Sequence, residues 1–358
     1  MTFTSLLRPL TVCVSAMTLC CGIVVFAHAI QNPSPATSMR SVEAISKQAP
    51  ITPQAMAVAT PDSYSSDVAM SILQRGGNAI DAAIAVQFVL AVTLPEAGNI
   101  GGGGFMVIHT AQGNDFIDYR ETAPKAAFRD MYLDANGEVE RLKSLYGVLA
   151  SGTPGTVAGM AKAHQLHGSM PWSELVQPAV DLANKGFVVH PKLARNVASY
   201  LERIDTRKLD VNFAKYFGTV AAGEIFIQRE LGATLERIRD HGAAGFYSGK
   251  TADLIVQYMQ QNNGLISADD LAEYTAQQRE PIVTPWRNFT LVSAAPPSSG
   301  GIAIAQWLNM FERLNPRINN ADGSTSPRLA HNSPEYVHLL AEIGKRVFAD
   351  RAEYLGDP

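Results

Sequence analysis

Hydrophobic residues recur with helical spacing in several stretches of the chain. In residues 67–74 the apolar side chains fall on one side and two glycines follow, which predicts a helix that ends there. Residues 79–93 are apolar on almost all sides, and Asn78 is placed to cap them, so we predict a helix buried against a sheet. The same reasoning predicts helices over 155–166, 172–185 and 333–354 and a capping box at 267–270.

Short apolar runs bounded by turn residues predict strands. Four glycines at 101–104 precede the run FMVI at 105–108, and a second run at 115–119 follows a short turn, which predicts a hairpin. Residues 289–293 predict a further strand, whereas the polar stretch 315–327 predicts a loop. This mixture of helices and strands favours an α/β or α+β layered domain.

The N-terminal segment has the pattern of a secretory signal. Arg8 is followed by an apolar run over 9–29 that ends in Ala-His-Ala. A basic start, an apolar middle and a small-residue exit predict a signal peptide and an exported protein, periplasmic or extracellular. A membrane anchor is an alternative, because the run approaches spanning length. Lipoprotein processing at Cys20 is a weaker alternative, because small residues do not precede it.

These features divide the chain into three parts. We predict a signal peptide over 1–29, a flexible tether rich in Ser, Pro, Ala and Gln over 30–53, and a folded domain over 54–358. Cleavage after residue 29 would leave 358 − 29 = 329 residues. The three cysteines all precede that point, so disulfides and cysteine nucleophiles are excluded for the mature chain.

Composition narrows the class of protein further. The chain of 358 residues is 46% hydrophobic and 17% charged, which excludes an intrinsically disordered protein. The formal net charge of −4 gives no indication of nucleic-acid binding and no polybasic membrane signal.

The glycine run and a histidine pair are the first candidates for chemistry. The glycines could cradle an anion or an oxyanion, or they could let a hairpin pack closely against a helix. A dinucleotide-binding loop is excluded, because the predicted order is helix, glycines, strand. His164 and His167 have the spacing of two metal ligands, but no partner ligand lies at a recognisable spacing. We therefore predict surface histidines and no metal site.

A denser motif is Asp-Tyr-Arg-Glu-Thr-Ala-Pro at 118–124. Arg120 lies there at the end of a predicted strand. Its guanidinium could bind a carboxylate through two parallel hydrogen bonds, or it could form an ordinary surface ion pair. The residues alone leave both readings open.

Six motifs in order resemble the large-subunit part of the γ-glutamyltranspeptidase family, also called glutathione hydrolases. The resemblance covers about residues 51–358. The motifs are RGGNAIDAA at 75–83, GNIGGGGF at 98–105, YRETAP at 119–124, SGTPGTVAG at 151–159, PPSSGG at 296–301 and ADRAEYLGDP at 349–358.

The resemblance implies an α+β fold of the N-terminal-nucleophile hydrolase type with αββα layers, here incomplete. It implies γ-glutamyl transfer or hydrolysis on glutathione and related compounds, without a metal or an organic cofactor. Arg120 matches the family arginine that holds the α-carboxylate of the glutamyl group, and Glu121 would support it. The glycine run is then expected to be packing beside the site.

The family nucleophile is the N-terminal threonine of a small subunit, within a Thr-Thr-His type of stretch. This chain contains no Thr-Thr pair, so no catalytic residue is assigned in it and a catalytic small subunit is the expected partner. The alternatives are an inert fragment or binding module, and a related acylase of the same superfamily.

Overall fold

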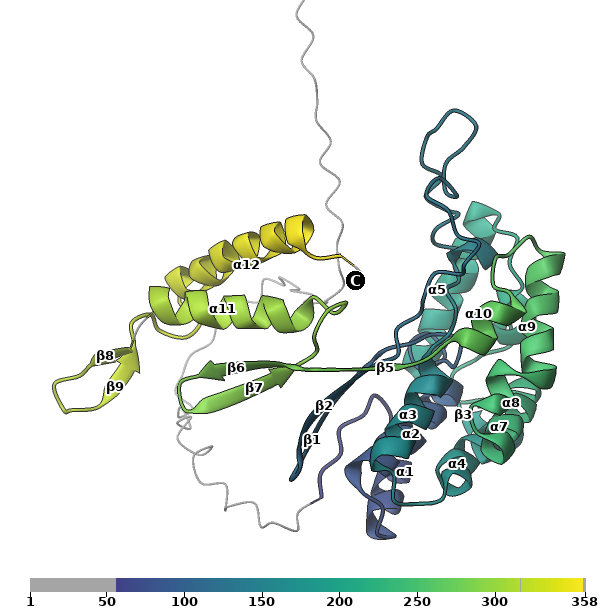
Figure 1. Ribbon diagram of the computed structural model, residues 1–358, viewed down its shortest axis with the longest axis horizontal. Helices are drawn as coiled ribbons and strands as arrows, with labels where there is room; N and C mark the ends of the chain where they lie inside the picture. The colour runs from purple at the N-terminus through teal and green to yellow at the C-terminus, as the bar shows by residue number, and fades with distance from the viewer. Residues whose placement is uncertain (1–55, 316, 357–358) are drawn as a thin grey trace, which may run out of the picture. The chain divides into compact units, whose positions relative to one another are not determined.

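The structure is a computed structural model that describes residues 56–315 and 317–356, and Figure 1 labels its helices and strands. The predicted signal peptide and tether lie outside the described residues. Within the described residues, no helix is long and apolar enough to cross a membrane.

A group of helices surrounds α2 and forms most of the hydrophobic core. Phe88 and Val89 of α2 are fully buried, as the sequence predicted. The predicted neighbour of α2 was wrong, because α2 packs mainly on α1, α3 and α4 rather than on a sheet. The bounds of these helices are α1 Ser63–Gln74, α2 Ala79–Thr93, α3 Thr156–His167 and α4 Trp172–Lys185.

Asp81 fixes the start of α2 and the loop between α3 and α4. Its carboxylate accepts the backbone N–H of Asn78 at 2.9 Å, which completes a capping box, and the N–H of Ser169 at 3.0 Å. The Ser169 hydroxyl also donates to it. The side chain is fully buried. Burial alone would raise the pKa of Asp81, but these hydrogen bonds outweigh it and hold the pKa below its usual value of 3.8.

Asp81→Asn is expected to lower the free energy of unfolding at pH 7 by about 2–3 kcal/mol, because an amide oxygen replaces only part of the acceptor capacity of a carboxylate. The lowered pKa makes this stabilisation present above the unfolded value near 3.8 and lost as the pH falls through the folded value. The difference between the two proteins should therefore shrink below about pH 4. Urea unfolding across pH measures it.

The matched control is Asp67→Asn, which changes an exposed aspartate of α1. It should alter the free energy of unfolding by less than about 0.5 kcal/mol. Equal effects of the two substitutions at pH 7 would contradict the role assigned to Asp81.

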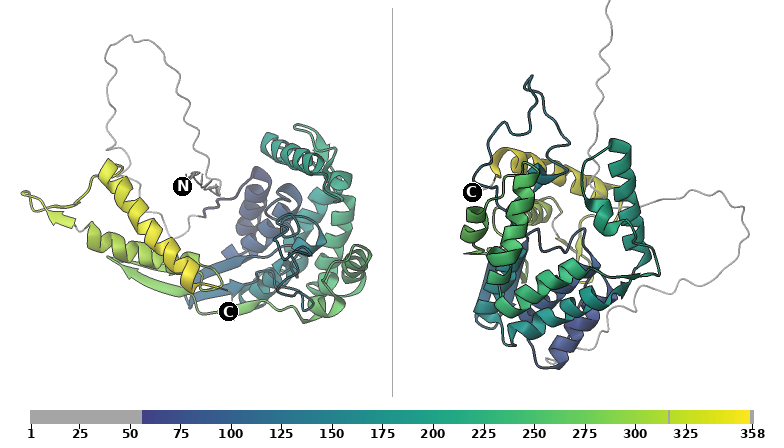
Figure 2. Two further views of the ribbon diagram at one scale, coloured as in Figure 1. Left: turned by 90° about the horizontal axis from the view of Figure 1, so that it is seen from above. Right: turned by 90° about the vertical axis from the view of Figure 1, so that its right-hand side faces the viewer.

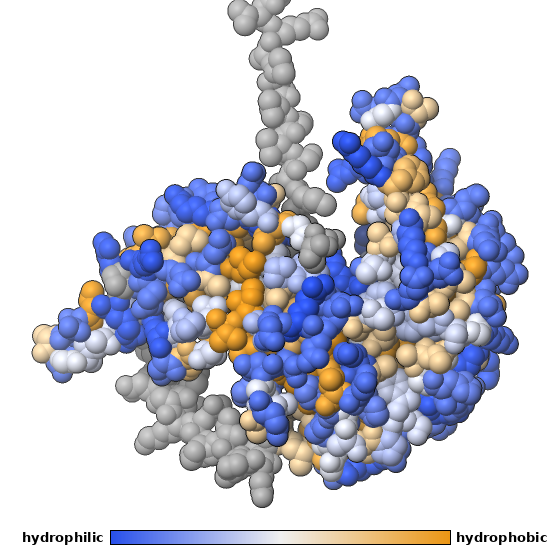
Figure 3. Space-filling model, viewed as in Figure 1, coloured by the Kyte–Doolittle hydropathy of each residue, from blue (hydrophilic) through white to orange (hydrophobic). Residues whose placement is uncertain are grey.

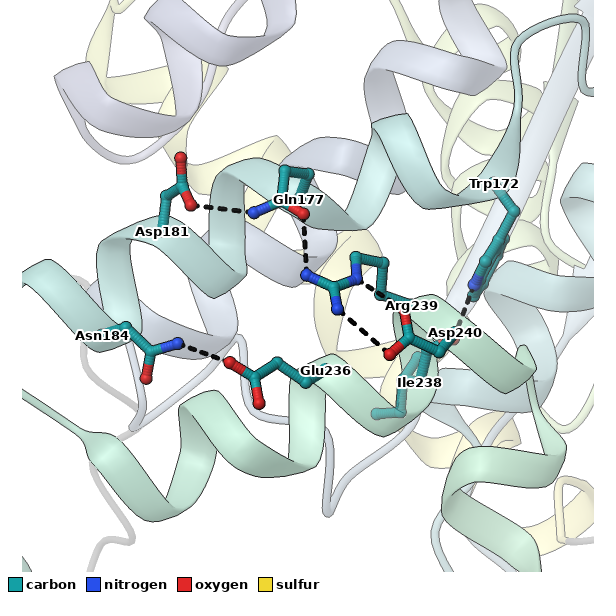
Figure 4. Close-up of polar contacts among 8 residues, drawn as sticks. All are labelled: Trp172, Gln177, Asp181, Asn184, Glu236, Ile238, Arg239 and Asp240. Atoms are coloured by element: carbon teal, nitrogen blue, oxygen red, sulfur yellow. Dashed lines mark hydrogen bonds and ion pairs between the residues drawn. The ribbon is translucent and has the colours of Figure 1, made fainter.

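α4 packs against α7 (Arg229–His241) through apolar residues and a row of polar contacts (Figure 4). Arg239 donates to Gln177 at 2.8 Å, and Asn184 donates to Glu236 at 2.9 Å. At one end of the row, the Trp172 indole N–H donates to the carbonyl of Ile238 at 2.8 Å. These contacts fix how the two helices lie against each other.

A three-stranded antiparallel sheet carries the predicted hairpin, in the order β1-β2-β5. Met106 pairs with Ile117, so these side chains share the face that joins the helical core. Phe116 pairs with Arg279 on the opposite face. The strands are β1 Phe105–Thr110, β2 Gly113–Asp118 and β5 Gln277–Arg279.

The remaining elements before β5 are mostly helical. The short strands β3 and β4 pair antiparallel with each other. The bounds are η2 Val148–Ala150, β3 Phe187–Val188, α5 Pro191–Arg207, α6 Phe213–Phe217, β4 Ile225–Phe226, α8 Ala244–Tyr247, α9 Gly249–Gln261 and α10 Ala268–Glu273.

After β5 the chain forms two hairpins and two long helices. The helices α11 and α12 lie side by side, as Figure 1 and the left-hand view of Figure 2 show. The predicted loop over 315–327 was wrong, because it contains the hairpin β8-β9. The bounds are β6 Ile282–Trp286, β7 Phe289–Ser293, α11 Gly300–Leu314, β8 Arg317–Asn319, β9 Thr325–Pro327 and α12 Pro334–Tyr354.

Apolar side chains are exposed on this last group of elements. Figure 3 shows hydrophobic residues at the surface over α11. Phe289 is 59% exposed, Ile304 44% and Phe348 60%. Within the described residues these side chains belong to neither hydrophobic core cluster.

Candidate functional site

Arg120 is the second residue after β2, and both its backbone N–H and its carbonyl are hydrogen-bonded. Its N–H donates to a carboxylate oxygen of Asp118 at 3.1 Å, and its carbonyl accepts the Tyr274 hydroxyl at 2.7 Å. The side chain is exposed. Among the ion pairs of residues 56–315 and 317–356, none includes Arg120. Its guanidinium is therefore available to a ligand.

Asp118 does not neutralise that guanidinium, because it has another partner. Its carboxylate is 6% exposed and accepts the Nε–H of Arg279 from β5 at 2.8 Å. Asp118 and Arg279 point to the same face of the sheet, two positions apart in the register. The buried negative charge of Asp118 is thus balanced by the guanidinium of Arg279 in the same sheet.

A cavity of about 510 Å³ opens beside Arg120. Charged side chains of both signs line it, and such a lining suits a ligand that carries both a carboxylate and an ammonium group. The charged lining residues are Arg120, Lys125, Arg279, Asp118, Glu121, Asp270 and Glu273.

Glycines bring neighbouring segments against the Arg120 backbone. Gly104 and Tyr119 exchange two backbone hydrogen bonds of 3.0 and 3.2 Å. A Cβ on Gly103 would overlap the Tyr119 carbonyl, and a Cβ on Gly152 would come within 3.0 Å of Glu121. Gly103 and Gly104 of the predicted glycine run therefore pack closely against the segment that carries Arg120, as the packing interpretation expects.

Three tyrosines with raised pKa values, Tyr119, Tyr247 and Tyr274, lie in or next to the segment that carries Arg120. Tyr119 is buried, and burial raises its pKa to about 12. The rings of Tyr247 and Tyr274 are stacked, with centroids 5.8 Å apart and planes at 4°. Burial also raises the pKa of both hydroxyls, so they stay protonated donors at any ordinary pH.

The predicted surface histidines lie apart from this cavity and are half-buried. The His164 ring nitrogen contacts the carbonyl of Met170 at 2.8 Å. His167 approaches the carboxylate of Asp115 at 2.7 Å. Within residues 56–315 and 317–356, no cluster of three or more ligand-type side chains has a geometry that could hold a metal ion.

Comparison with known families adds the deciding observation. The family model described as gamma-glutamyltranspeptidase matches residues 65–358, which is most of the chain. The chain belongs to the γ-glutamyltranspeptidase family.

Curated glutathione hydrolase proenzymes are among the similar sequences. That of Pseudomonas aeruginosa is 52% identical over 305 residues, which are 84% of this chain and 52% of that protein. That of Escherichia coli is 41% identical over 336 residues, which are 93% of this chain and 56% of that protein. The chain spans about half the length of the curated relatives it matches.

A solved structure agrees with the fold. The γ-glutamyltranspeptidase of Pseudomonas nitroreducens, complexed with L-DON, superposes with a TM-score of 0.78 at 50% identity, covering 85% of this chain and 87% of that chain. The predicted α+β, N-terminal-nucleophile hydrolase class is therefore confirmed, and the chain covers the large-subunit portion of the family.

Sequence reasoning found Arg120 but missed the residues that hold it. Tyr274, Arg279 and Asp270 come from a region more than 140 residues away, and no local motif marks Tyr274 or Arg279. The capping box at Ser267 was the only signal in that region, and it indicated a helix start rather than a site.

Proposed function

We propose that this chain is the substrate-binding part of an enzyme that transfers or hydrolyses γ-glutamyl groups of glutathione and related compounds. The observation that carries the proposal is the exposed Arg120 guanidinium beside a cavity lined by both signs of charge. The family supports the same chemistry, because its curated members include glutathione hydrolases.

Arg120 would hold the α-carboxylate of the glutamyl group. A guanidinium presents two parallel N–H donors that match a carboxylate, so it fixes both the position and the direction of the group. Holding that end places the γ-amide at a defined point, and such positioning lowers the barrier to attack. Glu121 follows directly and lines the same cavity, where it would support Arg120.

The nucleophile would come from a small subunit. Its N-terminal threonine would attack the γ-glutamyl carbonyl, with its own α-amine as the base, and release the amine product. Water or an acceptor amine would then resolve the acyl-enzyme. Both of these relatives are named as proenzymes, which supports an origin of that subunit by cleavage of a precursor. We also propose export, from the signal pattern of residues 1–29.

The exposed apolar side chains of β7, α11 and α12 support the small subunit as partner. Phe289 and Phe348 would lose their contact with water under a further layer of structure, and burying such side chains is favourable by about 1.5–3 kcal/mol each.

Co-expression with the small subunit of the Pseudomonas aeruginosa relative tests the proposal. The complex should release p-nitroaniline from γ-glutamyl-p-nitroanilide. It should act at least about 100-fold less well on 4-aminobutyryl-p-nitroanilide, which lacks the α-carboxylate. Equal turnover of the two substrates would indicate an acylase that needs no carboxylate. A folded complex without turnover of either substrate would indicate a binding module.

A further inference from the structure

The loop that carries Arg120 is attached to α10 at both ends. At its start, the Arg120 carbonyl accepts the hydroxyl of Tyr274, the residue that directly follows α10 as its C-cap. At its end, the backbone N–H of Lys125 donates to Asp270 at 2.8 Å, and the Lys125 ammonium pairs with Glu273. A loop fixed at both ends to one helix has little freedom to shift.

Asp270 is itself held in place. Its carboxylate accepts the backbone N–H of Ser267 at 2.8 Å, and its own backbone N–H donates to the Ser267 hydroxyl oxygen at 3.1 Å, which completes the capping box of α10. The Ser267 hydroxyl also donates to the carboxylate at 2.7 Å. The same carboxylate therefore fixes the start of the helix and the far end of the loop.

The Tyr274 ring is fixed by its neighbour. It is stacked on Tyr247, whose hydroxyl donates to the carbonyl of Pro154 at 2.7 Å and lies 3.3 Å from the N–H of Ala158. Tyr247 is thus tied to the start of α3. Stacking restricts the rotation of the Tyr274 ring and so helps to keep its hydroxyl directed at the Arg120 carbonyl.

We propose that Tyr274 is a positioning residue for γ-glutamyl substrates: its hydroxyl holds the Arg120 peptide, and so aims the guanidinium at the α-carboxylate. The inference rests on the proposed function of Arg120. Tyr274 acts through Arg120 rather than on the reacting atoms. Its loss should weaken substrate binding more than it slows the chemical step.

The test is Tyr274→Phe in the co-expressed complex. Phenylalanine keeps the stacked ring and removes only the donor. The KM for γ-glutamyl-p-nitroanilide should rise about five- to tenfold, with kcat within about twofold of the unchanged enzyme. The kcat/KM for 4-aminobutyryl-p-nitroanilide should stay within about twofold, because that substrate has no carboxylate for Arg120 to hold.

Tyr132→Phe is the matched control. The Tyr132 hydroxyl also donates to a backbone carbonyl, that of Leu149 at 2.9 Å, and lies outside the cavity. The Tyr132→Phe substitution should leave the kinetic constants for both substrates unchanged.

Two results would overturn the inference. One is an unchanged KM for the γ-glutamyl substrate in Tyr274→Phe. The other is an equal loss on both substrates, which would show a general effect on folding. Failure of the proposed function has a different signature, because the unchanged enzyme would then fail to distinguish the two substrates.

Discussion

Arg120→Gln is expected to lower kcat/KM for γ-glutamyl substrates by about 10²–10³-fold. The change would remove the two charge-assisted hydrogen bonds that we propose to the α-carboxylate, worth about 3–4 kcal/mol together. Each 1.4 kcal/mol corresponds to about a tenfold change in rate or binding. The guanidinium is exposed and has no ion-pair partner in the described part of the chain, so the melting temperature should change by less than about 2 °C. Steady-state kinetics of the co-expressed complex measures the effect.

Two further variants show whether charge or shape matters. Arg120→Lys keeps the charge but loses the forked pair of donors, so its kcat/KM should lie between those of the unchanged enzyme and the glutamine variant. Arg141→Gln is the matched control, because Arg141 is exposed and lies outside the cavity. If Arg120→Gln and Arg141→Gln give equal kinetics, Arg120 does not bind the substrate.

Gly155→Ala is expected to destabilise the protein by about 3 kcal/mol and to disturb the site at the same time. Gly155 precedes α3, and its N–H donates to the carbonyl of Gly102 at 2.8 Å. A Cβ there would overlap the carbonyl oxygen of Tyr119 and the hydroxyl of Tyr274. The Tyr119 carbonyl is backbone and accepts the N–H of Gly104, so it cannot move aside without a cost in free energy. Thermal unfolding should show a fall of about 5–10 °C in the melting temperature.

Gly300→Ala is the control for this substitution. A Cβ at that position meets only the Ser298 hydroxyl at 3.4 Å, an ordinary contact distance. Alanine is also a better helix former at the start of α11. Its melting temperature should not fall. A melting temperature of Gly155→Ala within about 2 °C of the unchanged protein would refute the tight packing of Arg120's neighbours.

Local signals made the first part of the fold predictable. The helix α4 has the predicted bounds of 172–185, and α2 begins at its predicted cap, because apolar spacing and capping residues act within one or two turns. The hairpin β1-β2 followed from a turn between two apolar runs. The start of α1 was predicted four residues late, because its cap Asp62 lies before the apolar pattern begins.

Non-local pairing could not be predicted in the same way. The strand β5 consists of Gln277, Gln278 and Arg279, which show no apolar alternation, and its partner β2 is about 160 residues away. The hairpin β8-β9 is almost wholly polar and exposed, so its strands resemble a loop in sequence. The same difference applies to the candidate site. A local motif drew attention to Arg120, whereas the residues that hold its segment in place come from distant parts of the chain.

The attachment of Arg120 to α10 has a consequence for the order in which the protein is made. Tyr274 follows Arg120 by 154 residues. At a synthesis rate of about 5–20 residues per second, Tyr274 is therefore made about 8–30 s after Arg120. The same order holds whether the N-terminal end emerges first from a ribosome or from a translocation pore. The helices around α2 can pack during that interval, whereas the cavity beside Arg120 cannot be complete until Asp270, Tyr274 and Arg279 have been made. Shortened forms of the chain that end before Tyr274 would therefore keep Arg120 but lose the hydrogen bond from Tyr274 to its carbonyl.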